Sequence, residues 1–531
     1  VLYLLSIALK DLRPESDARE VQDYQAWPAK TLEAAAGIPV QDGGRIKPLV
    51  TLASFKMLQL HGARSMEITG ADGEVLTLKP LEWIMDCLFR PELAIQLPTF
   101  RVDNSEVLDA VGITAAGKRD RYSYEELRPG LERLMNLASS YQALPEGSEL
   151  TPEQNQTLSL AVNVRLFEGL IGYLGFARAG IALPPKEGIE LTHTQVSSLM
   201  ATAPMIRQTL IQAQSEGRGI PADLEVMLNG VLDAANASKY VLFLFPPKDP
   251  NTIEWISAGD RIMNVMMQTT REPELSVEDI RMLEDLTQAR AEGEASFRRE
   301  LESFRDRMGE RAEERGEFRS VPLEVDYFKK DWFLRALVVF LIGIPLVTAM
   351  WLTNGTRVSR WLSWATWAVS ATGFVFLVIP IVKRCVIMER PPIGNLYDTI
   401  IFIALALVGR ALLLEMMTRR RVIIGMAPLA AAFLIVLARR FEVGDAKDHL
   451  DPLVAVLVSN FWLTIHVITI TLGYAGGIVT AIIAIAAMLI RSLGLDDKGL
   501  RRSLLRAIYG CVCLTLFLSL VGTVLGGIWA N

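Results

Sequence analysis

The stretch FWLTIHVITITLGYAGGIVTAIIAIAAMLI, residues 461–490, decides the fold class of this chain. It contains no charged side chain, and about 20 helical residues suffice to cross the hydrocarbon core of a bilayer. Lipid offers the backbone no hydrogen-bond partner, so a spanning segment must be helical. Five further apolar segments follow Trp332, at 332–353, 361–382, 398–417, 422–438 and 505–529. The sequence therefore predicts a mainly α-helical polytopic protein with about six transmembrane helices in residues 332–531.

The charged residues divide the chain into two parts of opposite sign. The whole chain carries 54 Lys and Arg against 60 Asp and Glu, and 51% of its residues are apolar. Residues 1–331 hold 36 basic and 51 acidic side chains, whereas residues 332–531 hold 18 basic and 9 acidic ones. The first part is suited to water and the second to lipid. A single soluble globule is excluded, and so is a nucleic-acid-binding protein built on a basic domain.

Basic residues in the short loops predict the orientation in the membrane. Cytoplasmic loops carry an excess of Lys and Arg. One set of loops holds ten such residues and the other, 383–397 and 439–460, holds six. The first set is therefore expected in the cytoplasm, which places residues 10–331 outside it. We expect a multi-pass protein of the bacterial cytoplasmic (inner) membrane with a large extracytoplasmic domain.

Residues 10–331 are predicted to form a mainly helical domain. Residues 150–174 show helical spacing of apolar residues after a Thr-Pro start. The stretch 276–319 is dense in mixed charge and predicts a long solvated helix, with a docking surface as the alternative. Strand signals are scarce, and the best are GEVLTL (73–78) and YVLFLF (240–245).

The ends and the cysteines add further expectations. Residues 1–9 are interpreted as the stub of a preceding transmembrane helix, and we expect more chain beyond residue 531. The four cysteines include no CxxC or CxxCH spacing, which argues against a zinc site of that type and against haem covalently attached to this chain. Cys511 and Cys513 are expected on different helix faces, as small apolar fillers.

His466 is the sharpest candidate for chemistry. Ionisable residues at membrane depth are costly and mark functional sites. On a regular helix Ser459, Trp462, His466 and Gly473 lie near one face, with Gly473, Gly476 and Gly477 leaving room beside it. An imidazole next to an indole suits haem, whose iron takes an axial His. Arg439 and Arg440 would then bind the haem propionates. The alternative is an interfacial His that is hydrogen-bonded to a carbonyl or to water.

The remaining ionisable candidates have simpler interpretations. Arg410 is expected to pair with Glu415 or to extend toward water, with a pore or propionate contact as the alternative. His449 lies among Asp residues and is expected to be solvated. His61 and His193 lack a second metal ligand nearby in sequence and are interpreted as structural.

Three stretches of the apolar part resemble the CcsA half of system II cytochrome c biogenesis proteins. They are RPPIGNLYDTIIFIA (390–404), DPLVAVLVSNFWLTIHVITITLGYA (451–475) and LVGTVLGGIWAN (520–531). IPVQDGGRIKPLVTLA (38–53) and, more loosely, FPPKDPNTIEW (245–255) resemble the extracytoplasmic region of fused ResB–CcsA-type proteins. The residues that match the CcsA motifs as they stand are Asn395, Tyr397, Ser459, Trp462, His466, Val467, Tyr474, Gly527 and Trp529.

The resemblance implies transport and external presentation of haem b, followed by its attachment to the CxxCH motif of apocytochrome c. By resemblance His466 is an axial ligand of haem iron, and Trp529 leads into a tryptophan-rich haem-handling segment. Trp462 and Trp529 would pack on the porphyrin. Residues 332–531 would then be a CcsA-like domain that ends before the tryptophan-rich segment, and residues 10–331 a ResB-like or fused region. Cytochrome c synthase activity is expected only with the segments that lie beyond this chain.

The resemblance also implies partners and leaves a rival open. The expected partners are apocytochrome c, possibly a ResB-like subunit, and the lipid bilayer, with no nucleic acid. The rival is a haem-free polytopic transporter, or a membrane sensor with an extracytoplasmic ligand-binding domain. A related haem-delivery protein of another maturation system is a closer alternative. No inverted repeat or pair of broken helices supports a transporter.

Overall fold

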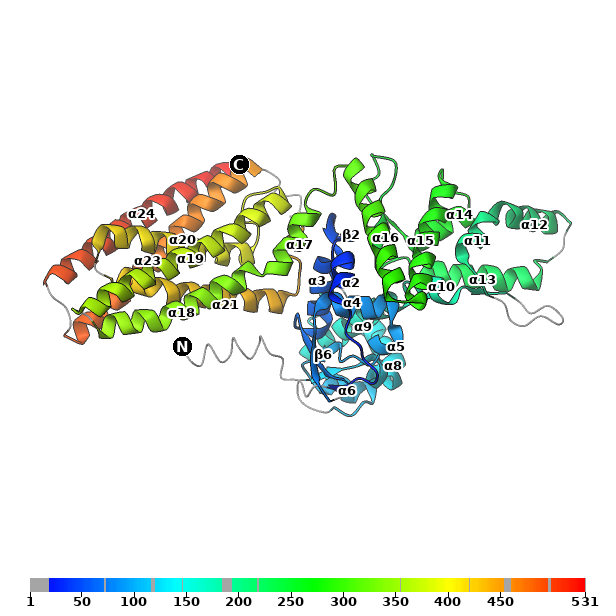
Figure 1. The fold of residues 1–531 in the computed structure, drawn as a ribbon, viewed down its shortest axis with the longest axis horizontal. Helices are drawn as coiled ribbons and strands as arrows, with labels where there is room; N and C mark the ends of the chain where they lie inside the picture. Colours follow the sequence, from blue (N-terminus) through cyan, green and yellow to red (C-terminus); the bar gives the residue numbers. More distant parts are fainter. Residues whose placement is uncertain are drawn as a thin grey trace. The chain divides into compact units, whose positions relative to one another are not determined.

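The computed structural model describes residues 19–70, 73–115, 120–145, 147–183, 193–216, 219–353, 355–419, 421–452, 460–494 and 498–530. The chain divides into two compact units, residues 1–325 and residues 326–531. Each unit has its own set of elements, labelled in Figure 1.

The first unit is mainly helical, as the sequence predicted, with four small sheets. Its helices are α2 (Ala29–Ala36), α3 (Leu49–His61), α4 (Pro80–Phe89), α5 (Pro91–Ala94), α6 (Glu106–Val111), α7 (Tyr124–Leu127), η1 (Arg128–Gly130), α8 (Leu131–Gln142), α9 (Pro152–Gly172), α10 (Gly175–Ala179), α11 (Val196–Ala201), α12 (Ala203–Ser215), α13 (Ala222–Ala237), α14 (Ala258–Met266), α15 (Pro273–Glu292) and α16 (Glu294–Glu314). Its strands are β1 (Arg19–Glu20), β2 (Pro39–Asp42), β3 (Arg45–Pro48), β4 (Met66–Thr69), β5 (Val75–Leu78), β6 (Phe100–Val102), β7 (Asp120–Tyr122), β8 (Ile181–Ala182), β9 (His193–Thr194), β10 (Phe243–Phe245) and β11 (Ile256–Ser257).

The sheets join segments that are distant in sequence. The four-stranded sheet has the order β11-β10-β2-β3, so the 240–245 segment pairs with residues near position 40. The three-stranded sheet has the order β1-β4-β5, with β1 parallel to β4. The remaining strands form the pairs β6-β7 and β8-β9. Both strand segments favoured by the sequence, 73–78 and 240–245, contain strands.

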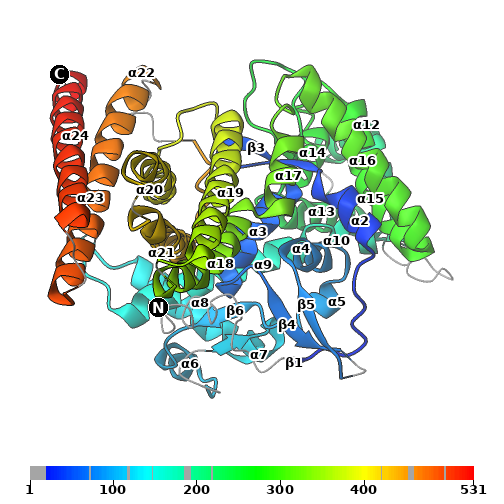
Figure 2. The ribbon, with the colours of Figure 1, turned by 60° about the vertical axis from the view of Figure 1, so that its left-hand side comes forward.

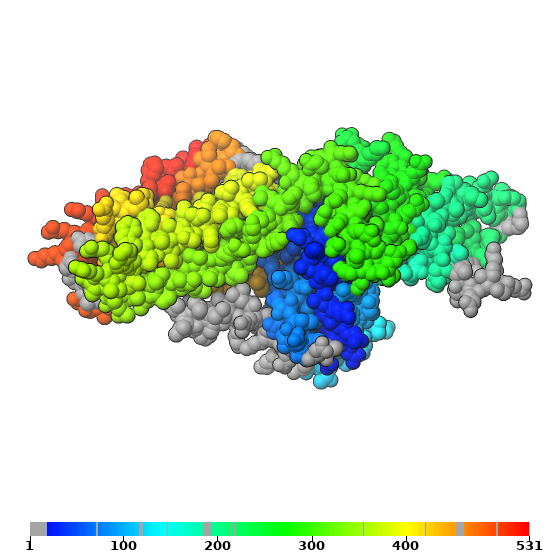
Figure 3. Space-filling model, viewed as in Figure 1, coloured from blue at the N-terminus to red at the C-terminus, as the bar shows by residue number. Residues whose placement is uncertain are grey.

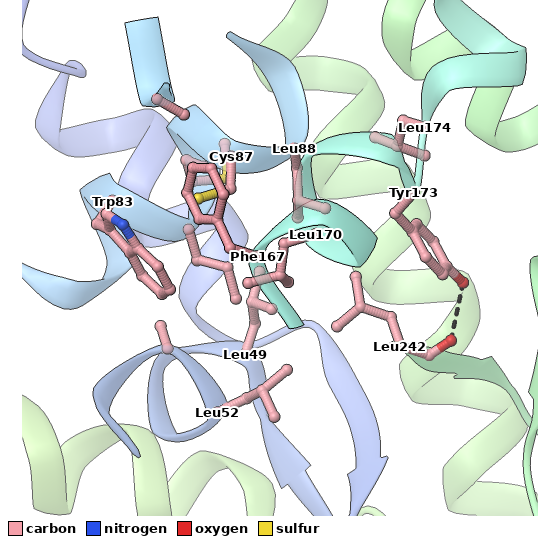
Figure 4. Packing of buried hydrophobic residues seen from close by; sticks show 14 of the residues in the cluster. Leu49, Leu52, Trp83, Cys87, Leu88, Phe167, Leu170, Tyr173, Leu174 and Leu242 are labelled. Atoms are coloured by element: carbon pink, nitrogen blue, oxygen red, sulfur yellow. Dashed lines mark hydrogen bonds between the residues drawn. The ribbon is translucent and has the colours of Figure 1, made fainter. Parts of the chain in front are cut away.

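One hydrophobic core runs through the first unit. Trp83, Phe167 and Tyr173 are completely buried in it. Figure 4 shows Tyr173 beside Leu242, whose carbonyl oxygen accepts the tyrosine hydroxyl at 2.9 Å. The bond satisfies a polar group that would otherwise be stranded among leucines.

Helix α9 confirms the helix that the sequence predicted from position 150. The hydroxyl oxygen of Thr151 caps it by accepting a hydrogen bond from the backbone N–H of Gln154, and Oε1 of Gln154 accepts one from the backbone N–H of Thr151. The span Pro152–Ala179 is long and apolar enough to cross a membrane, but Val164 and Phe167 on α9 are buried in the core of this unit.

The mixed-charge stretch 276–319 differs from its prediction. It forms two packed helices, α15 and α16, which meet at Gly293 with φ of 138°. Leu283 and Leu301 on their inner faces are buried in the core. The expectation of one long solvated helix was wrong because the apolar stripe, although sparse among charges, finds a partner in the first unit.

The second unit is a bundle of long helices, as predicted for a polytopic membrane protein. After α17 (Val321–Lys330), which contains the boundary between the units, come α18 (Trp332–Leu352), α19 (Arg357–Met388), α20 (Leu396–Thr418), α21 (Ile423–Asp445), the short α22 (Asn460–Trp462), the π-helical turn η3 (Leu463–Val467), α23 (Ile468–Ser492) and α24 (Lys498–Ala530). Six of the seven candidate membrane spans among the described residues lie in residues 321–529.

Neighbouring helices of the bundle pack as antiparallel pairs. Helices α18 and α19 pack together, as do α20 and α21, and α23 and α24. The last pair lies side by side in both ribbon views (Figures 1 and 2), and Figure 3 shows α18 and α19 in yellow-green along one face of the unit. The end of α19, the start of α20 and the segment directly after α21 lie together, since Arg384, Arg390 and Asn395 all donate hydrogen bonds to the carbonyl of His449.

Buried His61 makes the stability of the first unit depend on pH. Its Nδ1 lies 2.8 Å from the carbonyl oxygen of Pro98, so Nδ1 carries the hydrogen. Burial, and then the charge of Arg121, lower the pKa of His61 to about 3. The unfolded chain binds a proton below pH ~6.5 and the folded one does not. Folding is therefore destabilised as the pH falls from about 6.5 toward 3.

We expect the free energy of unfolding to fall by about 2 kcal/mol between pH 7 and pH 5 through this one group. Urea unfolding followed by circular dichroism of the full chain in detergent measures it. His61→Gln should remove most of that difference, whereas His193→Gln, at an exposed position, should keep it. An unchanged pH dependence in His61→Gln would refute this assignment.

Candidate functional site

His466 lies in a π-helical turn. Residues Leu463–Val467 form this turn between α22 and α23. Single π turns within α-helices are rare and occur often at functional sites. The wider turn changes the angular position of each side chain before it, so the predicted shared face of Trp462, His466 and Gly473 does not follow from regular α-helical spacing. Ser459, the fourth member of that face, lies outside the described residues.

The imidazole of His466 is fixed by α24. Its Nδ1 lies 2.7 Å from the carbonyl oxygen of Gly522. A carbonyl only accepts hydrogen bonds, so Nδ1 is the donor and Nε2 keeps its lone pair in the neutral ring. Within the described part of the chain Nε2 has no hydrogen-bond partner, and the side chain is half-buried.

Small residues and an indole on α24 surround the ring. A Cβ added to Gly526 would come 2.6 Å from Cε1 and 3.0 Å from Nδ1 of His466, so only glycine fits there. The indole of Trp529 lies with its centroid 6.0 Å from the imidazole, tilted by 51°. Figure 2 shows α22 and α24 near each other at this end of the unit. Neither Gly522 nor Gly526 was singled out in the sequence; their spacing of four along one helix face is the signal that could have found them.

Trp462, which the sequence placed on the same helix face as His466, has Phe461 as an aromatic neighbour. It is half-buried and packs edge-on against Phe461, with centroids 5.3 Å apart. Among the described residues no group of three His, Cys, Asp or Glu side chains could hold a metal ion. A single imidazole with a free Nε2 can still serve as an axial ligand, because a porphyrin supplies the equatorial nitrogens itself.

The glycines after His466 pack against other helices and leave no open room. A Cβ on Gly473 would come 2.6 Å from Oγ of Ser519, and one on Gly476 would clash with Arg410 and Thr515. Glycines of this kind let helix backbones approach closely in membranes. The expected space below the imidazole is therefore filled by α24 and by Arg410.

Arg410 and Glu415 do not form the predicted pair. The Arg410 guanidinium lies against Gly476 of α23. The Glu415 carboxylate accepts backbone N–H groups of Arg421 at 2.6 Å and Ile424 at 3.2 Å, at the start of α21. Those N–H groups lack partners within the helix. They therefore hydrogen-bond to the Glu415 carboxylate, and Arg410, five residues earlier on α20, does not pair with it.

His449 is buried, contrary to the prediction that it is solvated. Its ring stacks between Tyr397, 4.9 Å away and nearly parallel, and Phe441, 5.8 Å away. Burial lowers its pKa below the ordinary value. The neighbouring aspartates in the sequence suggested that the ring lies in solvent. The aromatic residues that bury it belong to α20 and α21, so the sequence around His449 does not indicate its burial.

Three side chains donate hydrogen bonds to the backbone carbonyl of His449. It accepts hydrogen bonds from Arg384 at 3.1 Å, Arg390 at 3.3 Å and Asn395 at 3.1 Å. Arg384 also pairs with buried Asp398 at 2.6 Å. Asn395 in turn caps α20 by accepting the backbone N–H of Asp398. The NLYD element of residues 395–398 is thus a structural junction at the start of α20. The Arg384–Asp398 pair was not singled out in the sequence, although a charge of each sign near a membrane end was visible there.

The two arginines that we expected to bind the haem propionates have different surroundings. Arg439 pairs with Asp331 at 2.6 Å, and the same aspartate caps α18 by accepting the N–H of Leu334. Arg440 is exposed on α21.

Cys511 is buried and Cys513 exposed, which agrees with their expected different faces. In the first unit, Arg45 belongs to the stretch 38–53 that resembles fused ResB–CcsA-type proteins. Its guanidinium forms an ion pair at 2.7 Å with the buried carboxylate of Glu324.

Comparison with known proteins agrees with this part of the chain. Residues 393–531 match the family model of the cytochrome c assembly protein. The chain is 27% identical over 187 residues to the cytochrome c biogenesis protein CcsA of Synechococcus sp. (strain CC9311), a match that covers 34% of this chain and 59% of that protein. It is 32% identical over 109 residues to CcsA of Synechococcus elongatus, covering 20% and 33% of the two chains.

The region that matches the family model contains the π-helical turn, the Gly522 carbonyl and Trp529. The chain spans about one third to three fifths of the length of the curated relatives that it matches. Residues 393–531 of this membrane protein are therefore similar to the cytochrome c assembly family and to its CcsA proteins.

Proposed function

We propose that this protein binds haem b at His466 and presents it for attachment to apocytochrome c in cytochrome c maturation. The observation that carries the proposal is the state of His466: Nδ1 is held by a backbone carbonyl at 2.7 Å, and Nε2 has a lone pair without a partner in the described residues. An imidazole whose second nitrogen is fixed in this way is a pre-oriented iron ligand.

The residues around His466 would position the haem. The carbonyl of Gly522 fixes the tautomer and the plane of the ring, and Gly526 lets the ring lie close to α24. Trp529 supplies a large apolar surface beside it. Trp462, half-buried at the start of the π turn, is the second indole that we assign to the porphyrin.

Arg439 and Arg440 are our candidates for the haem propionates. Arg439 already pairs with Asp331, so a propionate there would compete with that carboxylate. Arg440 lies on the exposed side of the same helix. When haem is bound, its vinyl groups are the atoms that react with the two cysteine thiols of a CxxCH motif, each thiol adding across one vinyl double bond.

We further propose that this end of the bundle faces the outside of a bacterial inner membrane, with residues 10–331 as an extracytoplasmic domain that docks apocytochrome c or a ResB-like subunit. The loop-charge asymmetry supports this orientation. A haem-free transporter or sensor is the outcome that the experiments below distinguish from it.

Replacement of the proposed ligand tests the function directly. His466→Ala should abolish the Soret band of the purified protein and the assembly of c-type cytochromes in cells, because no other histidine occurs in the described residues of α22 to α24. Added imidazole should restore the Soret band by entering the space left behind. His193→Gln, in the first unit, is the control with one histidine removed. Unchanged haem content in His466→Ala would sink the proposal.

Two adjacent glycines offer a matched test of His466 positioning. Gly526→Ala should displace the imidazole and weaken haem binding about ten-fold or more, as for other changes that misorient a metal ligand. Gly527→Ala adds the same methyl group where nothing lies within 4 Å. Haem titration of both variants, with thermal unfolding as a check on folding, makes the comparison. Equal affinities would show that the position of His466 does not control the haem site.

A further inference from the structure

One end of the membrane unit gathers arginine and tryptophan side chains that the haem proposal does not use. This end comprises the C-terminus of α18, the N-terminus of α19 and the turn between α20 and α21. We call the set the arginine–tryptophan surface; its members are Trp351, Arg357, Arg360, Trp361, Trp364 and Arg419.

Hydrogen bonds hold these segments together. The indole N–H of Trp351 donates to the carbonyl of Arg421 at 3.1 Å. The Arg421 guanidinium donates to Oγ of Ser359 at 3.0 Å, and that hydroxyl donates to the carbonyl of Met350 at 3.2 Å. The exposed side chains therefore stand on a fixed backbone.

Two of the three tryptophans on α19 are highly exposed. Trp361 is 76% and Trp364 69% accessible. They follow Arg357 and Arg360 by four residues each, so each arginine lies one helix turn above an indole on the same side of α19. Indoles favour the level of the lipid headgroups and glycerol, where one edge is apolar and the N–H meets water.

Within the described part of the chain, the arginines of this surface have no carboxylate partners. Arg357, Arg360 and Arg419 are exposed, and none forms an ion pair with any described residue. Glu415, the nearest acidic residue in sequence to Arg419, is buried and capped onto the start of α21.

The opposite end of the same helices is arranged differently. There Lys383 pairs with Asp326, Arg384 with Asp398, and Arg439 with Asp331. Among the described residues, these three cations are paired with carboxylates at this end, whereas Arg357, Arg360 and Arg419 at the other end remain accessible to an external anion. At headgroup depth the anion within reach of an arginine is a lipid phosphate, which a guanidinium can bind through two parallel hydrogen bonds.

We propose that the arginine–tryptophan surface is a binding site for anionic phospholipid. The guanidinium groups of Arg357 and Arg360 hold the headgroup phosphate, Arg419 adds to the positive potential, and Trp361 and Trp364 pack against the glycerol and upper acyl chain. A zwitterionic lipid offers the same phosphate with a cationic group attached, so the surface discriminates against it.

Native mass spectrometry of the full chain in detergent with equal amounts of phosphatidylglycerol and phosphatidylcholine tests this site. The wild type should retain phosphatidylglycerol in preference. Arg357→Gln with Arg360→Gln should reduce its retention about five-fold for each arginine, since each basic residue near an anionic surface contributes about 1 kcal/mol. Both side chains are exposed and unpaired in the described structure, so the fold should persist, and an unchanged thermal unfolding curve verifies it.

The matched control is Arg501→Gln with Arg502→Gln, which removes the same charge from two exposed positions at the start of α24. Retention near the wild-type value in this control supports a localised site. Equal losses in both double variants would overturn it in favour of general electrostatic attraction. Retention unchanged by Arg357→Gln with Arg360→Gln, or equal retention of the two lipids by the wild type, would also overturn it. Trp361→Phe with Trp364→Phe should weaken retention while the charge is kept.

Discussion

The buried ion pair between Arg384 and Asp398 is the interaction that holds together the helices and the loop at the start of α20. Their side chains are 5% and 0% exposed and 2.6 Å apart. Loss of one partner of such a pair leaves a buried charge and costs roughly 3–5 kcal/mol. The Arg384 guanidinium also donates to the hydroxyl of Tyr327 at 3.2 Å and lies over the ring of Tyr397. One charged group thus joins α17, α19 and α20, and through the carbonyl of His449 it also holds the loop after α21.

The proposed haem ligand is held in a different way from this junction. Three donors fix the loop after α21 at the carbonyl of His449. The imidazole of His466 is fixed by a single carbonyl of the facing helix α24, that of Gly522. A ring nitrogen held in this way by a neighbouring helix is what pre-orientation of a ligand requires.

Local sequence pattern predicted what local physics determines. Apolar length predicted the transmembrane helices, and Thr151 with Pro152 predicted the start of α9. The pattern missed features whose cause is distant in sequence. The burial of His449 depends on Tyr397 and Phe441, and its own neighbours are aspartates. Residues 276–319 look solvated because their charges outnumber a narrow apolar stripe, and only the partner surface in the first unit shows that the stripe is buried.

The candidate site likewise contains features that the sequence predicted and features that it missed. The sequence identified His466 and Trp529 through residue type and resemblance. It did not predict the π turn, which alters the spacing that had aligned Trp462 with His466. The same limit separates Arg410 from Glu415: their proximity on one helix suggested a pair, yet each meets a different helix. Helical periodicity describes which residues share a face, but it does not describe which unsatisfied backbone groups compete for a charge.

The distribution of ion pairs along the bundle has a physical reason that connects its two ends. A cation at the end of a membrane helix can be neutralised by a protein carboxylate or by a lipid phosphate. Internal carboxylates fix geometry, because both partners belong to one rigid bundle, and they are found where the loop before His466 is held. Lipid phosphates exchange and diffuse, so they can anchor the other end without dictating side-chain positions there. The end that positions the proposed haem ligand therefore needs internal pairing, while the end with Arg357 and Arg360 can leave neutralisation to the bilayer.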